Sequence, residues 1–119
     1  MSETPRTILL LTVSDSVHAG EREDKAGTLA AAALAAHGWE VRRALAPDEL
    51  TAIRATLEAH LGTVDVILTT GGTGLSARDV TPDATAPLLE RLIPGIPDAI
   101  RMLGRSQTPA AILSRGVAG

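Results

Sequence analysis

One short segment, TILLLTV at residues 7–13, limits the folds open to this chain more than any other. It is almost continuously apolar, yet it is too short for a membrane span or for the apolar core of a signal peptide. Short runs of this kind are typical of strands that are buried on both faces of a parallel sheet. We therefore expect a sheet with helices on either side of it.

The rest of the chain alternates between predicted helices and predicted strands. The expected helices are residues 24–37 and 47–61, each followed by a glycine, and two shorter stretches around Thr81-Pro82 and after Pro94-Gly95. The expected further strands are residues 39–45 (half polar, near an edge), 64–70 and 110–114. Strand–helix repeats connect by right-handed crossovers. The sequence thus predicts a single domain of residues 1–119 with a three-layer, doubly wound α/β fold, a mostly parallel sheet carrying helices on both faces.

The composition excludes several classes of function. Trp39 is the only aromatic residue among 119, so stacking on nucleic-acid bases has almost nothing to work with. The net charge is −3 and no basic stripe is present, which argues against binding to a phosphate backbone. The absence of cysteine removes disulfides, thiolate catalysis and cysteine-based zinc sites. We expect a cytoplasmic protein with no nucleic-acid partner and no membrane partner.

A glycine-rich turn, Gly71-Gly72-Thr73-Gly74, follows the third predicted strand directly. Consecutive glycines allow positive φ and a close approach of the backbone to a ligand, and successive N–H groups can bind an anion. A tight turn without a ligand is an equally good interpretation of these four residues alone. Ligands of doubly wound sheets bind beyond the carboxyl ends of the strands. That rule also selects Ser14-Asp15 and Ser114-Arg115, which follow the first and fourth predicted strands.

An acid, Asp79, stands just before the predicted helix start at Thr81-Pro82, where Thr81 is the expected N-cap. A carboxylate at this place can bind Mg²⁺ beside a phosphate, as in phosphoryl or nucleotidyl transfer. A salt bridge to Arg78 or a local helix cap is the alternative that the residues alone favour.

The stretch TTGGTGLSARDVTPDAT at residues 69–85 closely resembles the signature of the molybdopterin-binding domain of molybdenum-cofactor biosynthesis proteins. The resemblance extends to the segments TVSDS at 12–16, EDKAG at 23–27, PDE at 47–49 and AILSR at 111–115. Together these segments span about residues 6–119, in the family's order and at compatible spacing.

Within that family the chain is most similar to the stand-alone bacterial proteins. The resemblance implies an enzyme, a molybdopterin adenylyltransferase, that uses Mg²⁺ and ATP to transfer AMP to the terminal phosphate of molybdopterin ahead of molybdenum insertion. It also implies a homotrimer or larger ring, and a partner protein that inserts the metal. A non-catalytic molybdopterin-binding or scaffold protein is the alternative, since some relatives of similar sequence have little activity.

The resemblance also implies roles for individual residues. Gly71, Gly72, Thr73 and Gly74 would wrap a substrate or nucleotide phosphate through their N–H groups. Asp79 would act with Mg²⁺ or orient the reacting phosphate. Asp48 matches a second catalytic acid of the family, although beside Pro47 it would otherwise be taken as an N-cap.

Five further residues receive binding or supporting roles from the same resemblance. Ser14 and Ser114 would donate hydrogen bonds to the substrate, and Asp15 would support their loop. Lys25 would meet a phosphate or remain a solvated lysine at a helix start. Arg115 would be either a phosphate partner or part of a structural ion pair. Family members continue beyond the segment matching residues 114–119 with a strand, a loop and a helix, which we expect this chain to lack.

Overall fold

The computed structural model describes residues 5–119, so the first four residues of the predicted domain lie outside the described part. The elements along the chain are β1 (Thr7–Val13), α1 (Asp15–His18), α2 (Lys25–Ala36), β2 (Glu40–Ala46), α3 (Leu50–His60), β3 (Val66–Thr70), α4 (Thr81–Thr85), the 3₁₀ helix η1 (Ala86–Leu88), α5 (Gly95–Arg105) and the 3₁₀ helix η2 (Pro109–Leu113).

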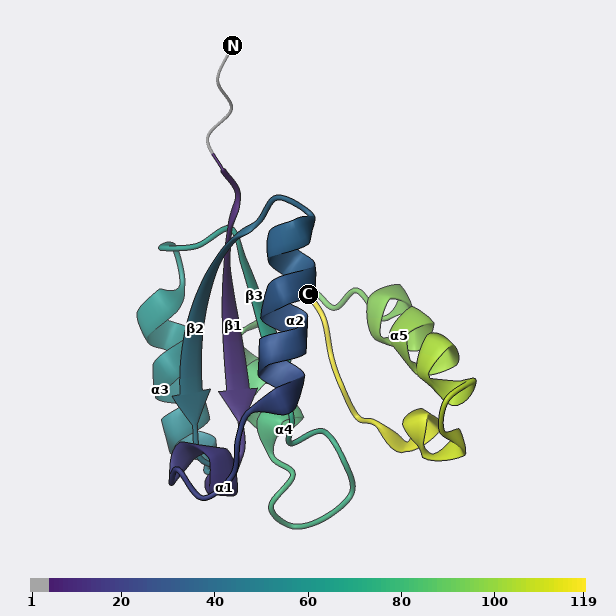
Figure 1. The fold of residues 1–119 in the computed structure, drawn as a ribbon. Coiled ribbons are helices and arrows are strands. Elements are labelled where there is room, and N and C mark those ends of the chain that lie inside the picture. The colour runs from purple at the N-terminus through teal and green to yellow at the C-terminus, as the bar shows by residue number, and fades with distance from the viewer. Residues whose placement is uncertain (1–4) are drawn as a thin grey trace.

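The three strands form a parallel sheet in the order β2-β1-β3. The chain moves from β1 to one neighbour and then crosses back over β1 to the other. Because both crossovers are right-handed, α2 and α3 must cover opposite faces of the sheet. Figure 1 shows this arrangement, and the predicted α/β architecture is confirmed. The half-polar strand β2 lies at an edge, as expected.

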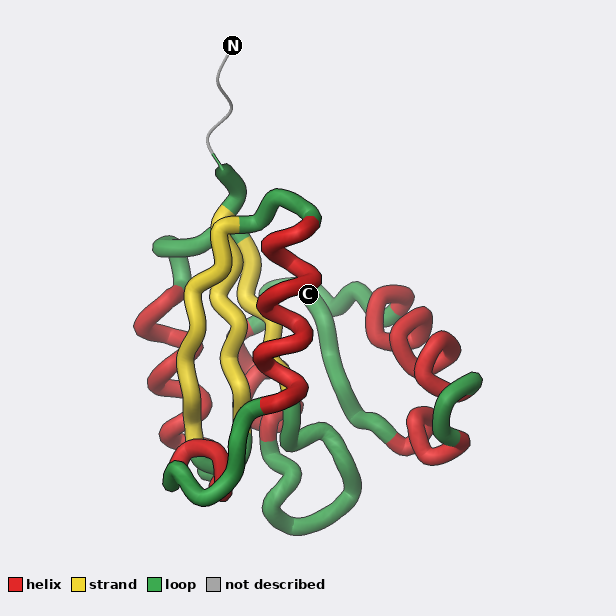
Figure 2. The backbone as a smooth tube through the Cα atoms, viewed as in Figure 1, coloured by secondary structure: helices red, strands yellow, loops and turns green. Residues whose placement is uncertain are grey.

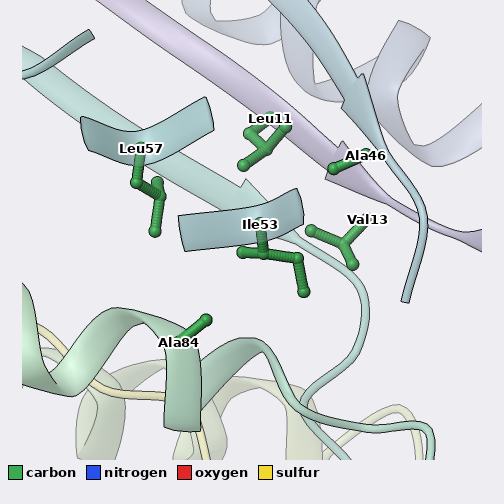
Figure 3. Packing of buried hydrophobic residues seen from close by; sticks show 6 residues of the cluster. All are labelled: Leu11, Val13, Ala46, Ile53, Leu57 and Ala84. Atoms are coloured by element: carbon green, nitrogen blue, oxygen red, sulfur yellow. The ribbon is translucent and has the colours of Figure 1, made fainter. Parts of the chain in front are cut away.

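The apolar run of β1 occupies the centre of the sheet because it is buried on both faces. On one face Leu11 and Val13 pack with Ala46, and with Ile53 and Leu57 of α3. Ala84 of α4 closes this cluster from below α3, as Figure 3 shows. The cluster contains only aliphatic side chains, which is how a chain with a single aromatic residue fills its interior.

A polar contact joins the sheet to α2 on the opposite face. The buried hydroxyl of Thr12 donates to Asp24 Oδ2 at 2.7 Å, and Asp24 Oδ1 accepts the N–H of Gly27 as the N-cap of α2. Arg43 of β2 adds an ion pair at 2.9 Å. Desolvation acts to raise the pKa of Asp24, but the hydrogen bonds from Thr12, Gly27 and Arg43 outweigh it and lower the pKa. Asp24 therefore ties β1, β2 and α2 together as a carboxylate.

The predicted fourth strand at residues 110–114 is wrong, because Pro109–Leu113 form η2. Pro109 has no N–H for a strand ladder and a φ suited to a helix start, and the two alanines after it favour helix. η2 packs against α5, where the Cβ of Ala111 lies 3.0 Å from the position a Cβ would take on Gly104. Figure 2 shows α5 and η2 as a helical pair standing beside the sheet layers.

One further segment differs from prediction. The expected polar loop after β1 contains α1, whose first N–H groups are capped by Ser14. Within residues 5–119, β3 pairs with β1 alone, so its other side is a sheet edge. No helix in this described part is both long and apolar enough to cross a membrane.

Candidate functional site

The loops that follow β1 and β2 are held together by two acids. The backbone N–H of Asp15 donates to Asp48 Oδ2 at 3.0 Å, and the backbone N–H of Asp48 donates to Asp15 Oδ1 at 2.9 Å. Asp48 therefore does not cap α3, which begins at Leu50 with Glu49 as its N-cap. Its Oδ2 is bonded to the loop that follows β1.

The glycine-rich turn needs glycine at Gly71 and Gly72 for two reasons. Their φ values are +95° and +70°, which side chains disfavour. A Cβ on Gly71 would overlap the carbonyl oxygen of Val13, and one on Gly72 would overlap Thr81 Oγ1 and lie 3.2 Å from Asp48 Oδ1. The turn thus passes directly over the end of β1 and beside the carboxylate of Asp48.

Thr81 fixes the turn from behind. It is buried, its hydroxyl donates to the carbonyl of Gly71 at 2.9 Å, and its N–H donates to the carbonyl of Gly72 at 3.1 Å. The prediction that Thr81 caps α4 is wrong by one residue, because its hydroxyl serves the turn and Val80 is the N-cap. The only sign of this role in the sequence was a hydroxyl residue, Thr81, two positions after Asp79 in the motif.

Asp79 closes a small loop within the same segment. Its Oδ2 accepts the N–H of Ser76 at 3.0 Å and would lie 2.8 Å from a Cβ on Gly74. The helix cap that the residues alone favoured is absent, because Ser76 precedes Asp79 and the N-cap of α4 is Val80, which makes no side-chain cap hydrogen bond. The suggested pair with Arg78 is absent as well, because Arg78 reaches Asp15 instead.

Arg115 braces the glycine-rich turn from the C-terminal side. Its Nε donates to the carbonyl of Gly74 at 3.1 Å and its Nη2 to the carbonyl of Asp79 at 2.6 Å. Its Nη2 also pairs with Asp83 at 3.0 Å, which raises the pKa of Arg115 and lowers that of Asp83. Of the two roles left open by the sequence, the structural ion pair is the one that this geometry contains.

The two predicted serines lie at the site but are held by neighbouring groups. Ser114 follows η2, not a strand, yet its hydroxyl donates to Thr73 Oγ1 at 3.2 Å. Ser14 Oγ accepts the N–H of Val17 and lies 3.3 Å from Ser16 Oγ. Lys25 is exposed at the start of α2. All the predicted site segments except that of Lys25 are thus linked through contacts at the carboxyl ends of the strands.

The sequence suggested Arg78 only as a salt-bridge partner of Asp79, but the structure places it elsewhere. Its Nη2 and Nε both donate to Asp15 Oδ2, at 2.6 and 3.2 Å, which joins the loop after β3 to the loop after β1. This contact is the main reason that the pKa of Asp15 is lowered, with the N–H of Asp48 adding to it. An arginine one residue before Asp79 was the only signal in the sequence.

Mg²⁺ commonly binds to one or two carboxylates together with substrate phosphates and water. Asp48 and Asp79 fit that description, because each commits Oδ2 to a backbone N–H and presents Oδ1 beside the glycine-rich turn. Within residues 5–119 no group of three or more His, Cys, Asp or Glu side chains is arranged to hold a metal by itself. A cation here would therefore also need oxygens from substrate phosphates or water.

An apolar groove of about 870 Å³ runs along the open edge of β3, between α3, α4 and α5. At one end it reaches the turn through Gly71, Thr73 and Ser114. Asp48 and Asp79 do not line it, so the two acids lie outside the groove, which adjoins the turn through Gly71 and Thr73.

Comparison with known proteins gives the family. A family model described as "Probable molybdopterin binding domain" matches residues 9–119, which is nearly the whole chain. This chain belongs to the molybdopterin-binding domain family. The family resemblance of the 69–85 motif is thereby confirmed, and in this family member the motif comprises the end of β3, the glycine-rich turn and α4.

Individual relatives agree with the family assignment. The molybdenum cofactor biosynthesis bifunctional protein of Chlorobaculum tepidum is 39% identical over 117 residues, which are 97% of this family member and 37% of that protein. The molybdopterin adenylyltransferase of Haemophilus influenzae is 38% identical over 115 residues, 91% of this chain and 57% of that one. The chain thus spans about a third to just over half of these relatives.

A solved structure shares the fold. The crystal structure of a molybdopterin biosynthesis protein from Mycobacterium abscessus superposes with a TM-score of 0.90 at 38% identity, over 96% of this chain and 73% of that one. The arrangement of sheet and helices described above is therefore that of solved members of the molybdenum-cofactor proteins.

Proposed function

We propose that this protein is a molybdopterin adenylyltransferase, transferring AMP from ATP to the terminal phosphate of molybdopterin. The observation that carries the proposal is the position of Asp48 Oδ1, 3.2 Å from where a Cβ would stand on Gly72. A carboxylate and a backbone that can surround a phosphate thus meet at one point. The relative from Haemophilus influenzae that carries this activity by name supports the same proposal.

In the proposed reaction an oxygen of the terminal phosphate of molybdopterin attacks the α-phosphorus of ATP. The new P–O bond forms as the bond to the bridging oxygen breaks, and pyrophosphate leaves with that oxygen. No protein nucleophile is needed, which agrees with a chain that has no cysteine. The protein's part is to position the two phosphates and to offset their charge.

Each part of the site has a proposed task in that step. The N–H groups of Gly71 to Gly74 bind phosphate oxygens, and the hydroxyls of Ser14 and Ser114 form hydrogen bonds with the substrate, that of Ser114 in place of its bond to Thr73. Asp48 and Asp79 would hold Mg²⁺, which when bound neutralises phosphate charge as the pyrophosphate leaves. Asp15 keeps Asp48 in place through the paired backbone contacts.

The test is a turnover assay with purified protein, molybdopterin, ATP and Mg²⁺, following adenylylated molybdopterin and pyrophosphate. Asp79→Asn keeps an oxygen for the N–H of Ser76 but loses the charge. We expect its turnover to fall by about a hundredfold or more, as for loss of a group that stabilises transition-state charge, while pterin affinity changes little.

Asp65→Asn is the matched control. Asp65 also accepts a backbone N–H, from Thr7 at 2.8 Å, but it lies at the opposite end of the sheet. We expect its turnover to equal that of the unchanged protein. Molybdopterin binding without product in the unchanged protein would contradict the enzyme and leave a binding or scaffold protein.

The remaining parts of the proposal concern assembly and location. We propose that residues 1–119 act as one domain in a homotrimer or larger ring, in the cytoplasm, and pass the product to a protein that inserts molybdenum. Exposed apolar side chains of α5, among them Ile100 and Leu103, are available for contacts between subunits. Light scattering of the purified protein measures the number of subunits.

A further inference from the structure

The ion pair between Arg78 and Asp15 uses only part of the arginine. Both of its hydrogen bonds, from Nη2 at 2.6 Å and from Nε at 3.2 Å, end on the same oxygen, Asp15 Oδ2. A guanidinium has five N–H donors, so three remain, two on Nη1 and one on Nη2. Asp15 Oδ1 is occupied by the N–H of Asp48, which fixes the carboxylate and with it the edge of the guanidinium that it holds.

The pair also spans the part of the molecule where a ligand has to enter. Asp15 follows β1 and Arg78 lies between β3 and α4, 63 residues further along the chain. The two side chains are 48% and 61% exposed, so the unused donors of Arg78 are accessible from solvent. An ion pair this exposed contributes little to folding stability, so stability alone is a weak reason for its presence.

Arg78 is surrounded by negatively charged side chains. Asp15, Asp48 and Glu49 all act on it, and they raise its pKa, the hydrogen bond to Asp15 most of all. Those acids would repel a polyphosphate if no cation stood among them. Arg115, the other arginine at the turn, is committed to the carbonyls of Gly74 and Asp79 and to Asp83.

We propose that Arg78, oriented by Asp15, is the cationic side chain that binds a phosphate group of the ligand. The inference rests on the proposed function and adds to it the residue that makes this contact. Asp15 is a positioning residue: it holds one edge of the guanidinium, and the opposite donors meet two phosphate oxygens, a geometry that arginine provides and lysine does not.

The test measures binding rather than turnover. Isothermal titration at fixed Mg²⁺ with inorganic pyrophosphate, ATP and adenosine compares the unchanged protein with Arg78→Gln and Arg78→Lys. We expect Arg78→Gln to weaken pyrophosphate and ATP binding about tenfold or more and to leave adenosine binding unchanged, because one charge-assisted contact is lost. The pyrophosphate affinity of Arg78→Lys should lie between those of the unchanged protein and Arg78→Gln, since lysine keeps the charge without the paired donors.

Two controls separate phosphate binding from a structural role. Arg54→Gln breaks an ion pair of similar exposure, with Glu58 on α3, and should leave all three affinities unchanged. Asp15→Asn keeps one acceptor oxygen where the carboxylate offers one to Arg78 and one to the N–H of Asp48, but it leaves the cation in place. We therefore expect a smaller loss of pyrophosphate affinity than in Arg78→Gln, whereas a purely structural pair would give equal losses. Increasing salt should weaken pyrophosphate binding less in Arg78→Gln than in the unchanged protein.

The outcomes for this inference and for the proposed function are distinct. Equal pyrophosphate affinity in the unchanged protein and Arg78→Gln, with turnover intact, overturns the role of Arg78 and leaves adenylylation standing. Adenosine binding that falls as much as pyrophosphate binding also overturns it, because the site as a whole would then be disturbed. An unchanged protein that binds neither pyrophosphate nor ATP and makes no product overturns both.

Discussion

Asp15 and Asp48 each accept the other's backbone N–H through their side-chain carboxylates, at distances of 2.9 and 3.0 Å. The two residues lie 33 positions apart, after β1 and before α3. Two backbone N–H groups and two carboxylate oxygens thus fix the separation of the two loops. This reciprocal contact also explains how Asp48 is aimed at the glycine-rich turn although it belongs to neither β2 nor α3.

Because this contact needs an oxygen but not a charge, substitutions can separate the structural role of Asp48 from its proposed chemical role. Asp48→Asn keeps an oxygen for the N–H of Asp15, whereas Asp48→Ala leaves that N–H without a partner. We expect Asp48→Ala to lower the free energy of unfolding by about 1 kcal/mol and Asp48→Asn by less than half of that. Both should lose adenylylation, because both lose the charge. Urea denaturation beside the turnover assay measures the two effects, and full activity in Asp48→Asn would remove Asp48 from the chemistry.

Gly72 is the position in the turn where a methyl group should do most harm. Gly72→Ala combines a φ of +70° with a Cβ that would overlap Thr81 Oγ1. Moving Thr81 would break its bond to the carbonyl of Gly71. We expect a loss of about 3 kcal/mol in the free energy of unfolding, from strain and overpacking together, and loss of ATP binding. Urea denaturation and isothermal titration with ATP measure the two effects.

Gly20→Ala is the control for that substitution. Gly20 has a similar φ, +76°, but no atom lies within 4 Å of the position that a Cβ would take there, so only the backbone strain applies. We expect a loss of about 1 kcal/mol and normal ATP binding. Equal effects of the two substitutions would show that the close approach of Thr81 has no consequence.

Asp24 should make the protein sensitive to acid. Its pKa is lowered in the folded state, so its contribution is present in full above the value of an unfolded aspartate, near pH 4, and is lost as the pH falls through the lower folded value. The side chain is only 13% exposed. We expect Asp24→Asn to lower the free energy of unfolding at pH 7 by about 1–2 kcal/mol and to reduce its decline below pH 4.

The comparison for Asp24 is Glu58→Gln, because the ion pair of Glu58 with Arg54 is about half exposed at both ends. Its acid dependence should match that of the unchanged protein, as measured by urea denaturation at several pH values. Asp15, Asp65 and Asp83 also have lowered pKa values. Every variant should therefore still lose part of its free energy of unfolding as the pH falls. An Asp24→Asn curve parallel to that of the unchanged protein would contradict the role of Asp24.

Substitutions of Arg115 and Asp83 test whether Arg115 supports the glycine-rich turn or binds a phosphate. As a brace, Arg115 needs Asp83 for orientation, so Asp83→Asn and Arg115→Gln should both speed hydrogen exchange at Gly72 to Gly74 and weaken ATP binding, Arg115→Gln more. As a phosphate partner, Arg115 would be released by Asp83→Asn and would bind ATP more tightly. Tighter binding in Asp83→Asn is therefore the result that contradicts the brace.

Local sequence was a good guide wherever one element decided its own structure. The apolar run of β1 can be satisfied only in the middle of a sheet, and Gly38 and Gly62, with φ values of +89° and +80°, end their helical segments. It was a poor guide at Pro109–Leu113, where a run of four apolar residues is as compatible with a helix as with a strand. Pro109, which suits a helix start, and the packing of η2 against α5 favour the helix there.

For the site, the sequence by itself determined that the segments after β1 and β3 meet, because the carboxyl ends of parallel strands share one edge of a sheet. The segment of Ser114 and Arg115 reaches the same place although it follows η2 and not a strand. Only the tertiary structure decided which side chain faces which. Arg78 could pair with neighbouring Asp79 or with distant Asp15, and the sequence favours the neighbour. Arg78 pairs with Asp15 because the turn brings it across to the end of β1, where Asp15 Oδ2 accepts from both Nη2 and Nε.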